Sequence, residues 1–122
     1  MKILVADNSF VHRATIIHAL SKIDCESIEA ANTEEAMRIL VNMHIDAVIV
    51  HLSLPPYGGI DFLTRSKNLL DENNVCRILT MAYHAEDFMN AAIDVGVEGI
   101  IVYPLKEQEI IEKVNHRLSG FS

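Results

Sequence analysis

The chain has little of what several classes of protein need. Among its 122 residues, 10 are lysine or arginine and 17 are acidic, which gives a formal net charge of -7. Nucleic-acid binding needs clustered basic residues that neutralise phosphates, so this charge argues against it. No apolar run approaches the length of a membrane span. The first apolar segment stops at Asp7 without a small-residue cleavage site, so we expect no signal peptide.

Cysteines and cofactor motifs are equally scarce. Cys25 and Cys76 fall in different predicted strands and are expected to be reduced and packed, which favours a cytoplasmic location. The loops after the first and third predicted strands lack the Gly- or Ser/Thr-rich sequence that cradles phosphate. The Asp-x-His-x-x-Gly signature of cobalamin domains is also missing. A flavodoxin-like cofactor domain is therefore disfavoured, and we expect no cofactor.

What the chain does have is a regular alternation of two patterns. Half of its residues are apolar, and no repeat, linker or low-complexity segment divides it, so we expect a single domain over 1–122. Short apolar runs predict strands at Lys2–Ala6, Glu26–Ala30, Ala47–His51, Arg77–Met81 and Gly99–Val102. Amphipathic runs predict helices at Phe10–Lys22, Glu34–Asn42, Ile60–Leu70, Glu86–Asp94 and Glu107–Leu118. This alternation predicts an α/β fold with a parallel sheet covered on both faces.

Three residues explain where elements begin or end. Asn32, followed three residues later by Glu35, predicts a helix N-cap with a reciprocal carboxylate. Gly96 is expected to end a helix in the left-handed conformation. Pro104 follows the fifth strand, where no backbone donor is needed.

The most informative segment is the third strand. The apolar run from Asp46 ends in His51, and a loop with Leu54-Pro55 and Gly58-Gly59 follows. In open parallel sheets, sites lie beyond the carboxyl ends of the strands. His51 is therefore the side chain that this strand delivers to the expected site.

Several segments occur in the order and spacing of a known family. They are Val5-Ala6-Asp7-Asn8-Ser9, Glu29–Ala36, Leu54-Pro55 with Gly59, and Ala92, Gly96 and Gly99 ahead of Tyr103-Pro104. Together they resemble the receiver domain of bacterial two-component response regulators, of the chemotaxis-regulator type. The resemblance implies a flavodoxin-like, doubly wound (βα)5 three-layer sandwich. Its parallel sheet has strand order 2-1-3-4-5, with the site above strands one and three. The resemblance also implies a cis bond between Tyr103 and Pro104.

The functional positions of that family are where the chain departs from it. A receiver holds magnesium with two adjacent acids and a phosphoacceptor aspartate, while a hydroxyl and a lysine bind the phosphoryl oxygens. The resemblance places Asp7 and Asn8 at the acids, His51 at the phosphoacceptor, Met81 at the hydroxyl and Tyr103 at the lysine. Neutral imidazole is a poor magnesium ligand, so this degenerate set implies weak or absent Mg²⁺ binding and no aspartyl phosphate.

Alternatives stay open at three of these positions. Thr80 is expected to point away from the site because strand side chains alternate, unless a bulge turns it inward. His51 is expected to be a structural residue that pairs with Asp7, which would raise its pKa; the alternative is that it accepts a phosphoryl group itself. Tyr103 either covers the vacated pocket or hydrogen-bonds across it to Asp7 or His51.

The remaining histidines are expected to be packed or on the surface. They are His12, His18, His44, His84 and His116. A transition-metal site formed by Asp7, His51 and His84 is a weaker alternative. An i, i+4 pair of helical ligands is not offered by His12 and His18, which are six residues apart.

These observations favour an atypical stand-alone receiver that works by phosphorylation-independent protein contact and is not an enzyme. The alternative is a receiver that still takes part in phosphorelay through a non-Asp residue such as His51. The resemblance implies a contact face made by the fourth helix, fifth strand and fifth helix, which could also support a homodimer. Its candidate residues are Glu86, Asp87, Asn90, Glu98, Ile100, Lys106, Glu107, Glu109 and Lys113. Their mostly acidic character favours a basic partner surface, on a histidine kinase or an output protein.

Overall fold

A computed structural model describes residues 1–83 and 85–119 of the chain. Its centre is one parallel sheet of five strands in the order β2-β1-β3-β4-β5. The strands are β1 (Lys2–Ala6), β2 (Glu26–Ala30), β3 (Ala47–His51), β4 (Cys76–Met81) and β5 (Gly99–Val102). The predicted fold class and strand order are confirmed.

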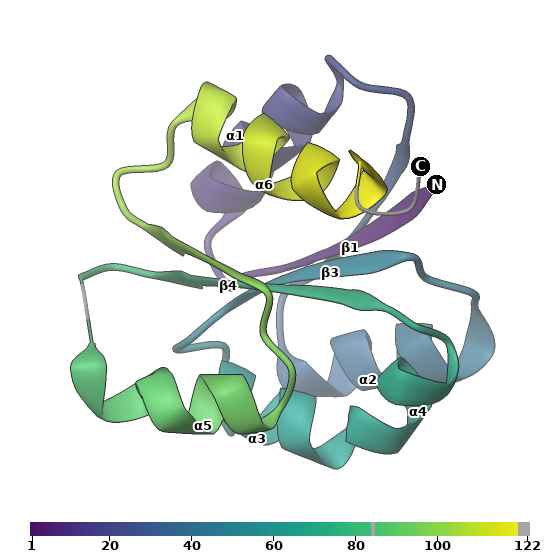
Figure 1. Ribbon diagram of the computed structural model, residues 1–122, viewed down its shortest axis with the longest axis vertical. Helices are drawn as coiled ribbons and strands as arrows, with labels where there is room; N and C mark the ends of the chain where they lie inside the picture. Colours follow the sequence, from purple (N-terminus) through teal and green to yellow (C-terminus); the bar gives the residue numbers. More distant parts are fainter. Residues whose placement is uncertain (84, 120–122) are drawn as a thin grey trace.

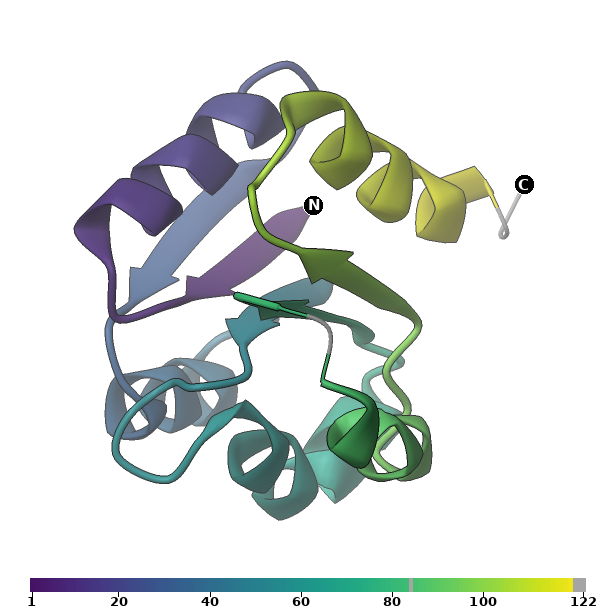
Figure 2. The same cartoon turned by 90° about the vertical axis from the view of Figure 1, so that its left-hand side faces the viewer.

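Helices cover both faces of this sheet, which makes three layers (Figure 1). The helices are α1 (Phe10–Leu20), α2 (Thr33–Asn42), α3 (Gly59–Arg65), α4 (Lys67–Glu72), the short 3-10 helix η1 (Glu86–Phe88), α5 (Met89–Asp94) and α6 (Glu107–Ser119). Figure 1 shows α1 and α6 on one face and α2 to α5 on the other. The turned view in Figure 2 shows the carboxyl ends of the strands, where the connecting loops gather.

Each face of the sheet has its own apolar core. Strand residues such as Val5, Ile49, Ile78 and Ile101 pack with Ile16 of α1 in the core beneath α1 and α6. Their neighbours in the sequence point to the opposite face. There they form a second core with residues of α2 to α5. Because side chains alternate along a strand, one residue of register decides which core a side chain joins.

The predicted helix boundaries have the expected causes. The Asn32 side chain accepts a hydrogen bond from the Glu35 backbone at 2.8 Å, and the Glu35 carboxylate accepts one from the Ala31 backbone at 3.1 Å. Gly96 ends α5 at φ +77°. The peptide bond between Tyr103 and Pro104 is cis, as the resemblance implied.

Two predicted helices are divided in the structure. The helix expected at Ile60–Leu70 breaks at Ser66, between α3 and α4. The buried Ser66 hydroxyl donates to the Phe62 carbonyl at 2.7 Å, a contact that commonly bends helices. The helix expected at Glu86–Asp94 begins as the 3-10 turn η1 before α5. None of the described helices is long and apolar enough to cross a membrane.

Candidate functional site

Four side chains from four strands meet at the carboxyl edge of the sheet. Each of them lies two residues after an apolar residue that packs beneath α1 and α6. The four side chains are those of Asp7, His51, Thr80 and Tyr103. The alternation of each strand therefore turns all four toward the same face. Parallel register then brings them together, as in the pairing of His51 with Thr80.

The Asp7 carboxylate is the anion at the centre of this cluster. The residue is 3% exposed, and both of its carboxylate oxygens have partners within the chain. Oδ1 accepts a hydrogen bond from the Ser9 backbone at 2.8 Å. Oδ2 accepts one from the Tyr103 hydroxyl at 2.6 Å. The first bond comes from the loop that also caps α1, because the Ser9 side chain accepts from the His12 backbone at 3.2 Å.

Tyr103 is the hub that links the strands. Its hydroxyl lies 3.2 Å from His51 Nδ1 and 3.5 Å from Thr80 Oγ1, in addition to its bond to Asp7. The two rings of Tyr103 and His51 stack with centroids 5.2 Å apart. Burial raises the pKa of the phenol, and the hydrogen bond to Asp7 raises it further. Tyr103 is therefore a neutral hydrogen-bond donor. Of its two predicted roles, the structure shows the hydrogen bond across the pocket to Asp7.

Two oxygens face the Nδ1 atom of His51. This nitrogen lies 3.1 Å from Thr80 Oγ1 and 3.2 Å from the Tyr103 oxygen. Because the Tyr103 proton is directed to Asp7, that oxygen offers His51 only lone pairs. The tautomer of the ring sets the direction of these contacts: an Nδ1–H donates to the oxygens, whereas a bare Nδ1 accepts from the Thr80 hydroxyl.

The expected raised pKa of His51 is wrong. Burial, which penalises the charged ring, lowers the pKa below its usual value and outweighs the attraction of Asp7. Tyr103 also stands where a direct bond between His51 and Asp7 was expected. The imidazole is consequently neutral near pH 7 and does not supply a fixed positive charge.

His12 is the site residue that the sequence interpretation missed. Its Nδ1 lies 3.4 Å from Asp7 Oδ2, within ion-pair range but without hydrogen-bond geometry. Its ring meets the Tyr103 ring edge-on, with centroids 4.4 Å apart. The sequence did contain a clue to this role. His12 lies in the first turn of the helix that follows Asp7, and that turn starts at the same edge of the sheet.

The Arg13 side chain fixes the backbone at the end of β1. Arg13 donates to the Asp7 carbonyl oxygen at 2.7 Å and pairs with Glu29 at 2.9 Å. Arg13 therefore ties the end of β1 to β2 through α1. It binds the main chain of Asp7, so it does not occupy the carboxylate.

The predicted roles of Met81 and Thr80 are reversed. Met81 is 1% exposed and packs in the core on the α2 to α5 side. Thr80 lies on the site face and contacts His51, so Thr80 is the hydroxyl of the cluster. No bulge is needed, because β3 and β4 pair in regular register through His51 and Thr80.

The residues present do not fit a magnesium ion. Magnesium binds hard, anionic oxygens, and here both Asp7 oxygens accept hydrogen bonds from the chain. Asn8 is exposed, and the neutral His51 directs its Nδ1 at two hydroxyl oxygens. Within residues 1–83 and 85–119, no group of three or more His, Cys, Asp or Glu side chains is arranged to hold a metal. The alternative metal site that included His84 lies outside the described residues.

The predicted contact face lies away from this cluster, on η1, α5, β5 and α6. Most of its residues are exposed: Glu86, Asp87, Asn90, Glu98, Lys106 and Glu107. Glu109, Lys113 and Ile100 are only partly exposed. Ile100 packs against the core on the α2 to α5 side, and Lys113 packs over Gly99.

Comparison with known proteins identifies the family. Residues 3–115 match the model of the response regulator receiver domain. The chain therefore belongs to the response regulator receiver family, the signalling modules of two-component systems. Receiver domains of this family interact with kinases and output proteins, and they are signalling modules rather than enzymes.

Individual relatives differ in length. The chain is 31% identical over 118 residues to Chemotaxis protein CheY1 of Helicobacter pylori, covering 93% of this chain and 94% of that protein. It is 28% identical over 117 residues to Sporulation initiation phosphotransferase F of Bacillus subtilis, covering 96% and 93%. It spans only 49% of the Phosphate regulon transcriptional regulatory protein PhoB of Pseudomonas aeruginosa, with 27% identity and 92% of this chain covered. It spans 15% of the two-component response regulator-like protein APRR7 of Arabidopsis thaliana, with 23% identity and 90% of this chain covered.

Solved structures agree on the fold. A CheY-like receiver domain protein from Methanospirillum hungatei superposes with a TM-score of 0.87 at 18% identity, covering 98% of this chain and 94% of that one. A signal receiver domain of an HD domain-containing protein from Pseudomonas fluorescens gives 0.88 at 22% identity, with coverage of 98% and 94%. At these identities the likeness extends to the fold alone.

Proposed function

We propose that this receiver domain signals by protein–protein contact without being phosphorylated. The observation that carries the proposal is the occupied Asp7 carboxylate. In the receiver chemistry that the resemblance implies, this carboxylate helps to hold magnesium, and here Ser9 and Tyr103 take both of its oxygens. With His51 in place of the phosphoacceptor, the proposed cluster lacks both the metal site and the acceptor.

The cluster also lacks the charge that phosphoryl transfer needs. Phosphoryl transfer depends on cations that neutralise the developing charge on the oxygens. In this cluster Tyr103 is a neutral phenol at the position where the resemblance implies a lysine. Losing one such electrostatic contact commonly reduces a rate by about a hundredfold or more. Losing the lysine and the metal together supports a receiver that does not turn over phosphate.

One observation favours a second candidate, phosphotransfer through His51. A neutral imidazole keeps a lone pair on one ring nitrogen, which is the form that attacks phosphorus. Against this, the largest charge effect on the ring comes from the negative Asp7 carboxylate, which would repel an incoming phosphoryl group. The first candidate is therefore preferred.

Phosphotransfer separates the two candidates. Radiolabelled small-molecule phosphodonors and a labelled histidine kinase would be offered to the wild type and to His51→Gln. We expect no stable label on either protein. Label on the wild type that disappears in His51→Gln would establish the second candidate, and His116→Gln, an exposed histidine on α6, is the matched control.

The contact face is part of the same proposal. It comprises the exposed acidic residues of η1, α5 and α6 together with the apolar Phe88 and Ile93, which are 43% and 68% exposed. An apolar patch within an acidic rim suits a partner with an apolar centre and a basic rim, on a kinase, an output protein or a second copy. The partner complex should weaken as salt is added. Neither Cys25 nor Cys76 is part of a disulfide among the described residues, which supports a cytoplasmic location for this contact.

A further inference from the structure

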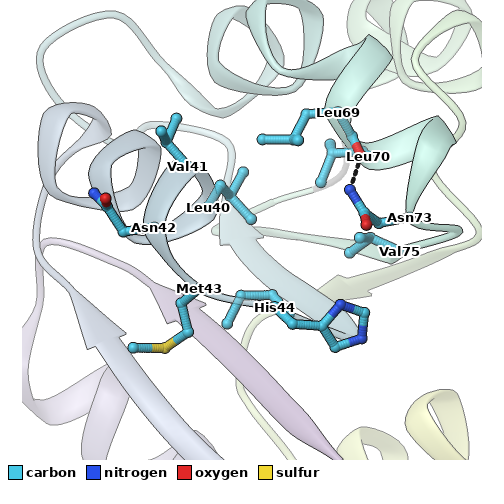
Figure 3. Close-up of a pocket in the computed structure, with 10 residues that line it drawn as sticks. Leu40, Val41, Asn42, Met43, His44, Leu69, Leu70, Asn73 and Val75 are labelled. Atoms are coloured by element: carbon cyan, nitrogen blue, oxygen red, sulfur yellow. Dashed lines mark hydrogen bonds between the residues drawn. The ribbon is translucent and has the colours of Figure 1, made fainter.

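Two grooves flank α2 on the face of the sheet opposite the Asp7 cluster. The first, of about 310 Å³, lies between the end of α2 and α4 (Figure 3). Its polar side chains have partners in the chain. Asn73 donates to the Leu69 carbonyl at 2.9 Å, Asn42 to the Arg38 carbonyl at 2.9 Å, and His44 lies 3.1 Å from Asp46. None of the described buried side-chain atoms that lack a hydrogen bond belongs to this groove.

The second groove, between α2 and α3, has a volume of about 420 Å³. Thr33, Met37 and Val41 line it from α2 at intervals of four residues, which places them along one helix face. Phe62 and Tyr57 line the opposite side. Although these side chains are mostly apolar, Val41 is 66% exposed and Tyr57 is 58% exposed. The volume is within the range of small-molecule sites.

Unmet hydrogen bonds gather at this second groove. In the part of the chain that the structure describes, four buried side-chain atoms lack a hydrogen bond, and two of them belong to residues that line it: Thr33 Oγ1 and Asp61 Oδ2. Thr33 is 6% exposed. Asp61 Oδ2 lies 2.7 Å from Arg65 Nε as an ion pair without hydrogen-bond geometry. A ligand that donates a hydrogen bond to Thr33 Oγ1 would supply the partner that this buried hydroxyl oxygen lacks.

The wall of the groove is held in place before any ligand binds. The Arg65 guanidinium lies over the Tyr57 ring, 4.8 Å from its centroid, and pairs with Asp61. The charges in the lining also balance, because Glu34 and Asp61 oppose Arg38 and Arg65. A preformed apolar wall with no net charge favours a neutral, flat ligand.

We propose that the groove between α2 and α3 binds a small neutral aromatic molecule that carries an N–H or O–H donor. The ring packs between Met37, Val41 and Tyr57, and the donor reaches the polar end at Thr33 and Asp61. The proposal does not depend on the proposed signalling function. The groove lies on the α2 to α5 face of the sheet, whereas the Asp7 cluster lies on the α1 and α6 face.

Paired probes test the proposal in solution. Indole and N-methylindole, and likewise phenol and anisole, differ in the donor while keeping the ring. Each would be titrated at millimolar concentration into the ¹⁵N-labelled protein and followed by amide shifts. We expect shifts confined to α2, α3 and the loop at Tyr57, with indole and phenol binding several-fold more tightly than their methylated partners.

Two variants and one control variant locate the binding. Val41→Glu should abolish the shifts, while Val11→Glu, at a matched α1 position that is 68% exposed, should leave them unchanged. Thr33→Val, which keeps the side-chain shape, should weaken indole roughly five- to tenfold and leave N-methylindole unaffected. An unchanged amide spectrum outside the groove verifies that each variant is folded.

Three outcomes overturn the proposal. One is the absence of saturable shifts from every probe, and another is a shift pattern that Val41→Glu does not alter. The third is equal affinity for the donor and methylated probes, which would make the groove a site for apolar side chains of a protein partner instead.

Discussion

The Tyr103 hydroxyl donates a 2.6 Å hydrogen bond to Asp7, joining the end of β5 to the end of β1 across 96 residues of sequence. A charged acceptor and a short distance mark this as a strong bond. It occupies the carboxylate around which receiver chemistry is expected to be organised. The proposed function follows from this pairing.

Removing the phenol should destabilise the fold. In Tyr103→Phe the Asp7 Oδ2 atom loses its hydrogen-bond donor while the residue stays 3% exposed. We expect a loss of about 1–3 kcal/mol in the free energy of unfolding, measured by urea denaturation. Tyr83→Phe, at a residue that is 75% exposed, is the control and should change stability little. Equal stability of the two variants would contradict the assigned bond.

Acidification should destabilise the protein through His51. Its folded-state pKa is lowered, so the unfolded chain takes up a proton at a higher pH than the folded chain does. The free energy of unfolding should therefore decrease as the pH falls below about 6.5 and continue to decrease until the folded-state pKa is reached. Denaturation at a series of pH values would show this slope in the wild type.

The slope is attributable to His51 by substitution. It should diminish in His51→Gln and persist in His116→Gln, an exposed position. NMR titration of the His51 ring should give a pKa below the usual value for histidine. A His51 pKa above the usual value for histidine would restore the earlier expectation of a charged ring.

Two glycines should respond differently to alanine. Gly96 has φ +77°, and a Cβ there would run into the Arg77 guanidinium, which donates to the Val95 carbonyl at 3.0 Å. We expect Gly96→Ala to lower the free energy of unfolding by about 1 kcal/mol or more, because alanine is strained at positive φ. In Gly99→Ala the new Cβ meets the flexible Lys113 side chain at 3.3 Å and Ile78 at an ordinary contact distance of 3.8 Å, so this change should cost less. Chemical denaturation compares the two, and a similar cost for both would contradict this account.

Restoring the acids and the lysine should restore receiver chemistry. The variant with Asn8→Asp, His51→Asp and Tyr103→Lys regains the charges that the resemblance implies, while Thr80 already supplies a hydroxyl on the site face. We expect this variant to bind magnesium and to accept phosphate from a small phosphodonor in a magnesium-dependent way. Labelling with and without magnesium measures the gain. A folded but unreactive variant would show that the scaffold itself, beyond these positions, has lost the chemistry.

The fold was predictable because its signals are local. Short apolar runs predicted the strands, and Asn32 together with Glu35 predicted the start of α2. The division at Ser66 was not predicted, since it depends on a hydroxyl that bonds to the Phe62 carbonyl in the folded helix.

The candidate site was harder, because its contacts join distant segments. Thr80 was misplaced because the resemblance assigned the hydroxyl position to Met81, which turned Thr80 toward the other face of the sheet. Strand alternation from Ile78, which packs in the α1 and α6 core, would have placed it correctly. His12 escaped notice because its contact with Tyr103 depends on how α1 packs at the edge of the sheet. The sequence does not show how deeply His51 is buried, and this burial lowers the pKa of the ring more than Asp7 raises it.

The most direct test is an amide NMR titration of the wild type with magnesium and beryllium trifluoride, a mimic of the phosphoryl group. The variant with restored acids and lysine is the positive control. We predict that the wild type shows no saturable shifts at Asp7, at His51 or along α5 and α6 at millimolar magnesium. Saturable shifts at Asp7 and His51 that require both magnesium and the mimic would contradict the account.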